Sequence, residues 1–269
     1  MKTLALFQAF IRSFFLQALW NFERMQNVGF AFSMEPLLRR AHRSRASFLR
    51  ALRRHFEYFN VHPYFAPIVM GVMFSREQML ADSERHEDTT MTVLKNSMGG
   101  AFGAIGDHVI WGTWRPFCAI MALSVGLLVV YPTSGGTSGP PVYSSTAELQ
   151  CAKWWIVGFL SMFNSIHIWL RWRGLSKAAQ EGPLVVHWLQ SLHLQAWAAQ
   201  IRRVGLLFLF IMVLIYLSRW TASEMLIWMV AVLLGSAILK RWGLSTAVLF
   251  YFVCGVSVVM TMLGIHWPS

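Results

Sequence analysis

Long apolar segments, almost free of charge, constrain the fold of this chain more than any other feature. Each approaches the length of about 20 residues that an α-helix needs to cross a bilayer. The whole chain is 56% hydrophobic and only 13% charged, with a mean hydropathy of +0.48, whereas soluble domains carry about 25% charge. We therefore expect an all-α integral membrane protein with about four to five membrane-spanning helices in its C-terminal half. The predicted spans are residues 112–131, 154–170, 204–218, 225–239 and 244–265.

The N-terminal half is less apolar, and its pattern differs. Residues 5–35 and 46–60 have the periodicity of helices, and the second is amphipathic and strongly basic. Segment 64–74 is too short to span a bilayer. Segment 96–112 is dense in glycine, so both pieces are predicted to enter the membrane as re-entrant hairpins, which are tolerated where they are buried in protein or line a cavity.

The positive charges cluster beside the apolar segments. The formal net charge is +11, and basic residues gather at 39–54, 171–203 and 240–241. The positive-inside rule places these clusters and the N-terminus in the cytoplasm, and the uncharged loop 131–145 outside. The C-terminus is then expected on the periplasmic or extracellular side. Because no nucleic-acid-binding motif accompanies the charge, no nucleic-acid partner is expected.

Motifs of catalysis and cofactor binding are not found in the sequence. Cys118, Cys151 and Cys254 lack the spacing of a disulfide framework or a zinc site. The glycine-rich segment follows no predicted strand and precedes no Gly-Lys-Ser/Thr, which excludes a phosphate-binding loop. We expect no metal, no cofactor and no self-sufficient catalytic site on this chain.

Polar side chains interrupt the apolar stretch "FFLQALWNFERMQNVGF", residues 14–30. If the stretch is helical, Glu23 lies beside Arg24, and one narrow polar face forms. Two interpretations remain open. The polar groups either make hydrogen bonds between helices, or they bind a neutral polyhydroxy ligand through amides, a carboxylate and an aromatic face. The polar face would carry Ser13, Gln17, Trp20, Asn21 and Arg24.

Further polar groups occur at two other places. Asn60 and His62 lie at the break "HFEYFNVHPY", and Asp107 follows Gly106 in the glycine-rich segment, eight residues before Arg115. His62 is explained equally well as packing a turn, and Asp107 as the counter-ion that allows Arg115 to enter the membrane.

Three ordered blocks carry a resemblance to a known family. The stretch "FIRSFFLQALWNFERMQNVGFAFSMEPLLRR", the stretch "RRHFEYFNVHPY" and the stretch "GDHVIWGTWRP" lie within the first 120 residues or so. They resemble the signatures of the IID component of the mannose/fructose/sorbose family of the bacterial sugar phosphotransferase system. Beyond these blocks the likeness is mainly one of hydropathy.

The resemblance implies a sugar-translocating subunit. It would be a multi-pass protein of the bacterial inner (plasma) membrane, working with a IIC membrane subunit as a trimer of heterodimers, while soluble IIA and IIB components carry the phosphate. No phosphorylated residue is expected on this chain, which would form one membrane domain, 1–269, with residues 1–117 contacting the substrate and 118–269 spanning the bilayer. The implied sugar-binding residues are Gln17, Trp20, Asn21, Glu23, Arg24, Asn60, His62, Asp107 and Arg115. Gln17 and Asn21 are expected to bond sugar hydroxyls, with Arg24 and Arg115 holding the acids.

The chain also departs from the family pattern. Where relatives have a "GPLAGIGD" run, this chain has "GGAFGAIGD". After "LQSL", a glutamate-bearing "TEGASILG" stretch of the family is replaced here by "HLQAWAAQIRRVG", which has no acid. This difference keeps a second hypothesis open, a membrane scaffold or receptor that retains the fold without transport.

Overall fold

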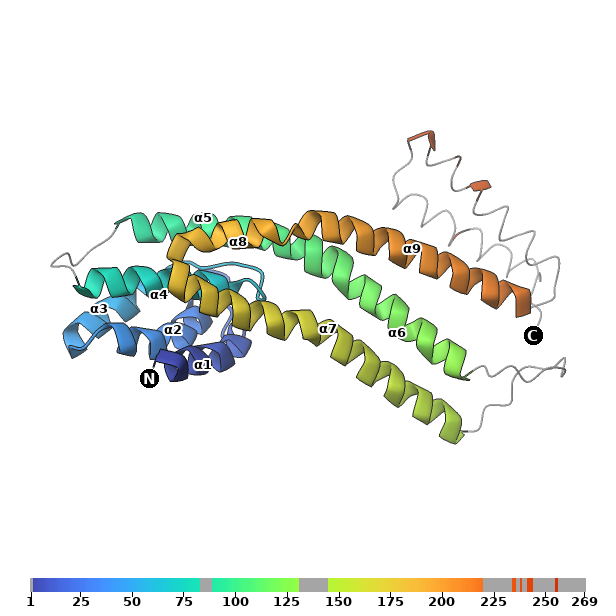
Figure 1. Ribbon diagram of the computed structural model, residues 1–269, viewed down its shortest axis with the longest axis horizontal. Coiled ribbons are helices and arrows are strands. Elements are labelled where there is room, and N and C mark those ends of the chain that lie inside the picture. Colours follow the sequence, from blue (N-terminus) through green and yellow to red (C-terminus); the bar gives the residue numbers. More distant parts are fainter. Residues whose placement is uncertain are drawn as a thin grey trace. The chain divides into compact units, whose positions relative to one another are not determined.

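The computed structural model describes residues 2–82, 89–130 and 145–219, and a few positions between 234 and 255 (Figure 1). The chain divides into two compact units. One consists of residues Met1–Val130 and Glu148–Leu206, and the other of Tyr131–Ala147 and Leu207–Ser269. All nine residues that are expected to bind sugar lie in the first unit.

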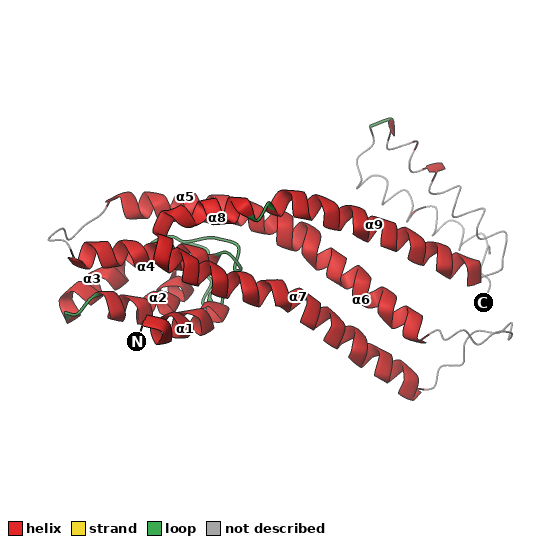
Figure 2. Ribbon diagram, in the orientation of Figure 1, coloured by secondary structure: helices red, strands yellow, loops and turns green. Residues whose placement is uncertain are grey.

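The described residues are helical, with no strand among them (Figure 2). Two isolated backbone bridges are the sole β-type pairing in this part of the chain. The predicted all-α class is therefore confirmed at the level of a mostly helical fold. The helices are α1 (Lys2–Arg12), the 3-10 turn η1 (Ser13–Phe15), α2 (Asn27–Ala41), α3 (Arg45–His55), α4 (Ala66–Asp82), α5 (Thr89–Gly106), the π-helix η2 (Asp107–Trp114), α6 (Arg115–Val130), α7 (Ser145–Glu181), the 3-10 turn η3 (Gly182–Leu184), α8 (Val185–Ser191) and α9 (Leu194–Arg219).

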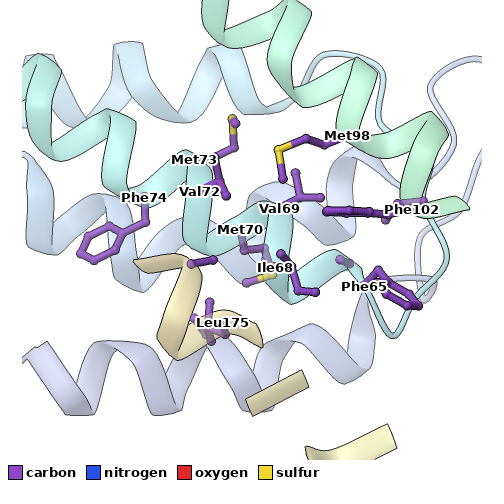
Figure 3. Packing of buried hydrophobic residues seen from close by; sticks show 14 of the residues in the cluster. Phe65, Ile68, Val69, Met70, Val72, Met73, Phe74, Met98, Phe102 and Leu175 are labelled. Carbon is purple, nitrogen blue, oxygen red and sulfur yellow. The ribbon is translucent and has the colours of Figure 1, made fainter. Parts of the chain in front are cut away.

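Helix α4 forms the centre of the hydrophobic core (Figure 3). Ile68, Met70 and Phe74 are fully buried, and they pack among side chains of α5 and α7 such as Phe102 and Leu175. The prediction of a re-entrant hairpin at 64–74 is wrong. The segment is short because other helices of the same chain cover it, so its apolar residues do not need to reach across a bilayer.

Small residues allow α4 and α7 to approach closely. A side-chain carbon added at Gly71 would lie 2.7 Å from the carbonyl oxygen of Leu175 and 2.6 Å from Cβ of Ala178. One added at Gly174 would overlap with Ile68. Contacts of this kind let helix backbones pack without intervening side chains, as is common in membrane proteins.

A buried ionic cluster fastens α2, α3 and α4 together. Glu77 of α4 is completely buried and accepts hydrogen bonds from Arg54 at 2.7 and 2.8 Å. It also bonds His42 at 2.8 Å and His55 at 2.9 Å. Burial alone would raise the pKa of Glu77, but these hydrogen bonds outweigh it and hold the pKa well below its usual range.

Residues 89–130 form one continuous helical rod made of α5, η2 and α6. The prediction of a hairpin at 96–112 is therefore wrong. The glycines do not break the helix. Gly106 instead brings the helix against the ring of His62, and Gly99 brings it against the backbone of Asn60. Gly100 and Gly103 meet no neighbouring atom within 4 Å.

The first predicted helix, 5–35, is interrupted. Helix α1 ends at Arg12, η1 follows, and the chain then turns until α2 begins at Asn27. The shared polar face inferred from a helical period therefore does not form. The second predicted helix, 46–60, begins at Arg45 but ends at His55, which leaves Asn60 and His62 in a loop.

One helical stretch among the described residues has the length and composition of a membrane span. It runs over Lys153–Met212, and its most apolar window has a mean hydropathy of 1.2; only 11% of that window is buried within the structure. The predicted span 112–131 corresponds to the end of η2 and α6, 154–170 lies in α7, and 204–218 lies in α9. The predicted spans 225–239 and 244–265 and the loop 131–145 lie almost wholly outside the described residues, so the number of spans stays a prediction.

Candidate functional site

A cavity of about 610 Å³ lies between the turn that precedes α2, the loop that precedes α4, and the rod of α5 and η2. Its lining combines amides, one carboxylate, a lysine, an imidazole and aromatic rings. The side chains that matter chemically are Gln17, Trp20, Gln26, Tyr58, Asn60, His62, Lys95, Asn96, Asp107 and Trp111.

Backbone pairing shapes the first wall of the cavity. Asn21 and Met25 exchange two hydrogen bonds, of 3.1 and 2.9 Å, which close a tight turn. Met25 has a φ of 57°, an unusual value for a residue with a side chain, because the turn requires left-handed backbone there. Gln26 then donates its backbone N–H to Phe59 at 2.8 Å, which joins the turn to the loop 56–62.

Buried amide side chains lock this wall in place. The carboxamide of Gln26 donates to the backbone oxygen of Val61 and accepts from its N–H, at 3.0 and 3.1 Å. Asn27 donates to Phe56 at 2.7 Å and accepts from Asn21 at 3.0 Å. The side-chain oxygen of Asn21 accepts from the N–H of Arg24 at 2.8 Å. Asn21 is thus engaged inside the turn and does not line the cavity.

His62 forms part of the second wall and is 2% exposed. Its Nδ1 accepts the N–H of Tyr64 at 3.3 Å, so the proton of the neutral ring lies on Nε2. Among the described residues Nε2 has no hydrogen-bond partner. Burial, together with the charge of Arg171, lowers the pKa of His62 to about 4. At neutral pH the ring is therefore an uncharged donor.

The third wall is one face of α5 and η2. Gly99, Gly103, Asp107 and Trp111 follow at intervals of four residues and all line the cavity, as the spacing of a helix allows. From Asp107 the rod adopts π-helical geometry, a feature frequent at functional sites.

Side-chain bonds hold the π-helical segment in place. Thr113 donates to the backbone oxygen of His108 at 3.0 Å. Arg202 of α9 contacts both Thr113 and the ring of His108 at 3.2 Å.

A buried arginine anchors the start of the first wall. Arg171 of α7 is 3% exposed and donates to the backbone oxygen and the hydroxyl of Ser13, at 2.7 and 2.9 Å. It also contacts His167, and its guanidinium lies over the ring of Phe14 at 4.8 Å. The segment that carries Gln17 and Trp20 therefore starts from a fixed point.

The structure brings together five of the nine residues expected from the sequence. Those that line the cavity are Gln17, Trp20, Asn60, His62 and Asp107. Glu23 and Arg24 form an exposed ion pair of 3.2 Å outside the lining. Arg115 lines a separate hollow of about 440 Å³ with Trp111 and Trp155. No ion pair joins Arg115 to Asp107 among the described residues. The sugar-binding role of all nine stays a prediction.

Sequence reasoning missed five of the ten lining side chains named above. Gln26, Tyr58 and Trp111 lie within the quoted blocks, but nothing in the sequence distinguishes them from their neighbours as residues that line a cavity. Lys95 is 1% exposed, 3.9 Å from Glu57 and 3.4 Å from the backbone oxygen of Arg54. Burial lowers the pKa of Lys95, and Glu57 opposes that shift. A lone lysine in "TVLKNSMGG" was the available signal for Lys95 and its neighbour Asn96.

The lining suits a ligand with many hydroxyl groups. Carboxamides both donate and accept, and Asp107 accepts. The exposed ring of Trp20 offers an apolar face of the kind that covers one side of a sugar.

Comparison with known proteins agrees with the family resemblance of the three sequence blocks. Residues 1–131 match the family described as the mannose/fructose/sorbose family IID component of the phosphotransferase system. The chain is 32% identical over 178 residues to the mannose-specific EIID component of Escherichia coli K12, covering 66% of this chain and 55% of that protein. The chain is a relative of the IID components. The chain therefore spans about half the length of the E. coli protein.

Other relatives and solved structures extend the likeness. The IID relative is 27% identical over 216 residues to the fructose permease IID component of Bacillus subtilis, covering 80% of this chain and 69% of that one. A structure titled as a membrane protein matches 97% of this chain and 96% of its own, with a TM-score of 0.64 and 22% identity. A chain from the mannose transporter ManYZ in complex with microcin E492 matches 97% of this chain and 95% of its own, with a TM-score of 0.53 and 24% identity. At these identities the solved structures show the fold alone.

Proposed function

We propose that this IID relative is a membrane subunit of a phosphoenolpyruvate-dependent sugar phosphotransferase system. It moves a hexose or an amino sugar across the inner membrane together with a IIC subunit, and the sugar is phosphorylated by the IIB component. The cavity of about 610 Å³ carries the proposal, because residues from all three signature blocks line it. The chain itself supplies binding groups and not the phosphoryl donor.

The partners follow from the same family relationship. A IIC subunit supplies the remaining part of the sugar site, and soluble IIA and IIB components deliver phosphate, with the membrane subunits arranged as a trimer of heterodimers. Exposed apolar side chains beside the cavity agree with a protein partner there, since Phe22 is 88% and Leu19 is 64% exposed.

Sugar uptake tests the proposal. Phosphoenolpyruvate-dependent uptake is measured over a panel of hexoses and amino sugars in cells with the complete set of components. We expect Asp107→Asn to lower uptake of the transported sugar at least tenfold, about 1.4 kcal/mol, because a charged acceptor of hydroxyl protons is lost. Co-purification with the IIC subunit should be retained. Unimpaired uptake would remove Asp107 from the site, and no uptake of any sugar by the wild type would contradict transport.

One observation favours the second candidate, a scaffold or receptor that does not transport. Where relatives carry a glutamate after "LQSL", this chain has no acid, and Arg202 of that region contacts the π-helical segment beside Asp107. A protein of this kind would assemble with the IIC subunit and bind sugar, but the uptake assay would give no signal above cells that lack it.

A further inference from the structure

A strongly basic surface lies on the outer side of α3 and the adjacent end of α2. We call it the basic face, and it consists of exposed arginines on a stretch that has no Asp or Glu from residue 36 to residue 56. Among the described residues none of them forms an ion pair, whereas Arg39 next to them pairs with Glu35. The basic face comprises Arg40, Arg43, Arg45, Arg50 and Arg53.

The inward-facing basic side chains of the same helix have a buried counter-charge. Arg54 and His55 point to Glu77 and bond it at 2.7 to 2.9 Å, so the buried carboxylate compensates the inward charges. Ser44 caps the start of α3 by accepting the N–H of Ser47 at 3.1 Å. The cap and the cluster fix α3 at both ends. The outward arginines are therefore presented on a rigid element without a counter-charge of their own.

Apolar side chains accompany the outward arginines. Leu49 of α3 and Phe56, the residue that follows its last turn, are 40% and 37% exposed. The positions 45, 49, 53 and 56 recur at intervals of four, four and three, so they share one face of the helical spiral. A helix surface that mixes arginines with exposed Leu and Phe is typical of helices lying at a membrane interface.

A bilayer is the partner that this chemistry fits. The stretch Lys153–Met212 is long and apolar enough to span a membrane and is scarcely buried in the structure, which places lipid next to the chain. We propose that the basic face binds the phosphate-bearing headgroups of anionic lipids, with Leu49 and Phe56 entering the boundary between headgroups and acyl chains. The positive charges of the arginines attract the anionic phosphate groups of the lipid surface.

Lipid binding to the purified full-length chain tests the proposal. The chain is kept in a zwitterionic detergent, and binding of phosphatidylglycerol and of phosphatidylcholine is measured by native mass spectrometry. The variant carries Arg45→Gln, Arg50→Gln and Arg53→Gln. A second triple with lysine at the same positions keeps the charge. The matched control carries Arg173→Gln, Arg203→Gln and Arg241→Gln, which removes equal charge from exposed sites elsewhere.

We expect the glutamine triple to weaken phosphatidylglycerol binding at least twentyfold, since each arginine near an anionic surface contributes about fivefold (~1 kcal/mol). The lysine triple and the control should change it less than about threefold, and an excess of inorganic phosphate should not displace the lipid, because a lone ion lacks the acyl chains. Unchanged melting temperatures of all three variants exclude unfolding.

Three results would overturn the proposal. The wild type would bind phosphatidylglycerol no better than phosphatidylcholine, the control triple would lose as much binding as the glutamine triple, or inorganic phosphate would displace the lipid completely. Wild-type binding to an acidic soluble protein without preference for phosphatidylglycerol would assign the basic face to a protein partner instead.

Discussion

At the scale of single residues, His62 shows how the fold fixes the tautomer of a side chain that lines the cavity. Its ring packs against Gly106, meets Trp111 at 4.8 Å between ring centroids, and accepts the N–H of Tyr64. These contacts fix the neutral tautomer and leave Nε2 as a donor. The sequence indicated a polar residue at a chain break before Pro63, but the contacts that select the tautomer depend on tertiary packing.

The lowered pKa of His62 predicts a pH dependence of stability. In the unfolded chain the imidazole binds a proton near pH 6.5, whereas in the folded protein it does so only near pH 4. Its contribution to stability is therefore fully present above about pH 6.5 and is lost as the pH falls towards about 4. His62→Gln should flatten the decrease in denaturation midpoint over that range. His187→Gln, at an exposed position, should leave the wild-type slope; equal slopes for His62→Gln and wild type would contradict the prediction.

The limits of sequence reasoning are visible in the amides. Gln17 and Asn21 look alike in the sequence, yet Gln17 lines the cavity and Asn21 bonds the backbone and side chain of its own turn. Residue type predicted that both would be satisfied by hydrogen bonds. Asn21 meets partners three to six residues away, but the turn that brings them together is held by a distant segment, the loop that Gln26 contacts at Val61.

At the scale of elements, the turn 16–26 departs most from the sequence prediction. It contains no Pro or Gly, so local propensity favours a helix. The structure instead pairs its backbone with Phe59, a bond that a helix could not make. For helix α4, the apolar composition predicts a buried segment. Its burial by α5 and α7 depends on tertiary packing and could not be read from the sequence.

Close packing of α5 on the loop before α4 predicts unequal effects of two glycine substitutions. A side-chain carbon at Gly106 would overlap with the ring of His62, whereas one at Gly103 meets nothing within 4 Å. Gly106→Ala should lower the free energy of unfolding by about 1–3 kcal/mol, the usual cost of overpacking. Gly103→Ala, the matched control on the same helix, should be neutral or stabilising, because alanine favours helices. Denaturant unfolding in detergent measures both, and equal effects would refute the packing argument.

The buried cluster at Glu77 predicts that α3 depends on one carboxylate. Glu77→Gln leaves Arg54 without its buried counter-charge, so we expect a loss of about 3–5 kcal/mol in unfolding free energy. Glu181→Gln removes the half-exposed pair with Lys177 and should cost no more than about 1 kcal/mol. The same unfolding assay compares them. A loss below about 1 kcal/mol for Glu77→Gln would mean that the cluster does not fasten α3.

At the scale of the molecule, three signature blocks separated along the chain meet at one cavity. The turn before α2, the loop before α4 and the rod of α5 and η2 supply its walls. The sequence indicated the polar composition and the membrane character of the chain. It did not indicate that residues 66–74 form a buried core helix or that the 89–130 segment is one rod, because both depend on which helices cover which.

The most direct test of the account is a structure of the purified complex with its IIC subunit, determined with the transported sugar bound. We predict that the sugar lies in the cavity, within hydrogen-bonding distance of Gln17 and Asp107, with Trp20 against one face of the ring. A sugar bound at a site that touches none of these residues would contradict the central claim.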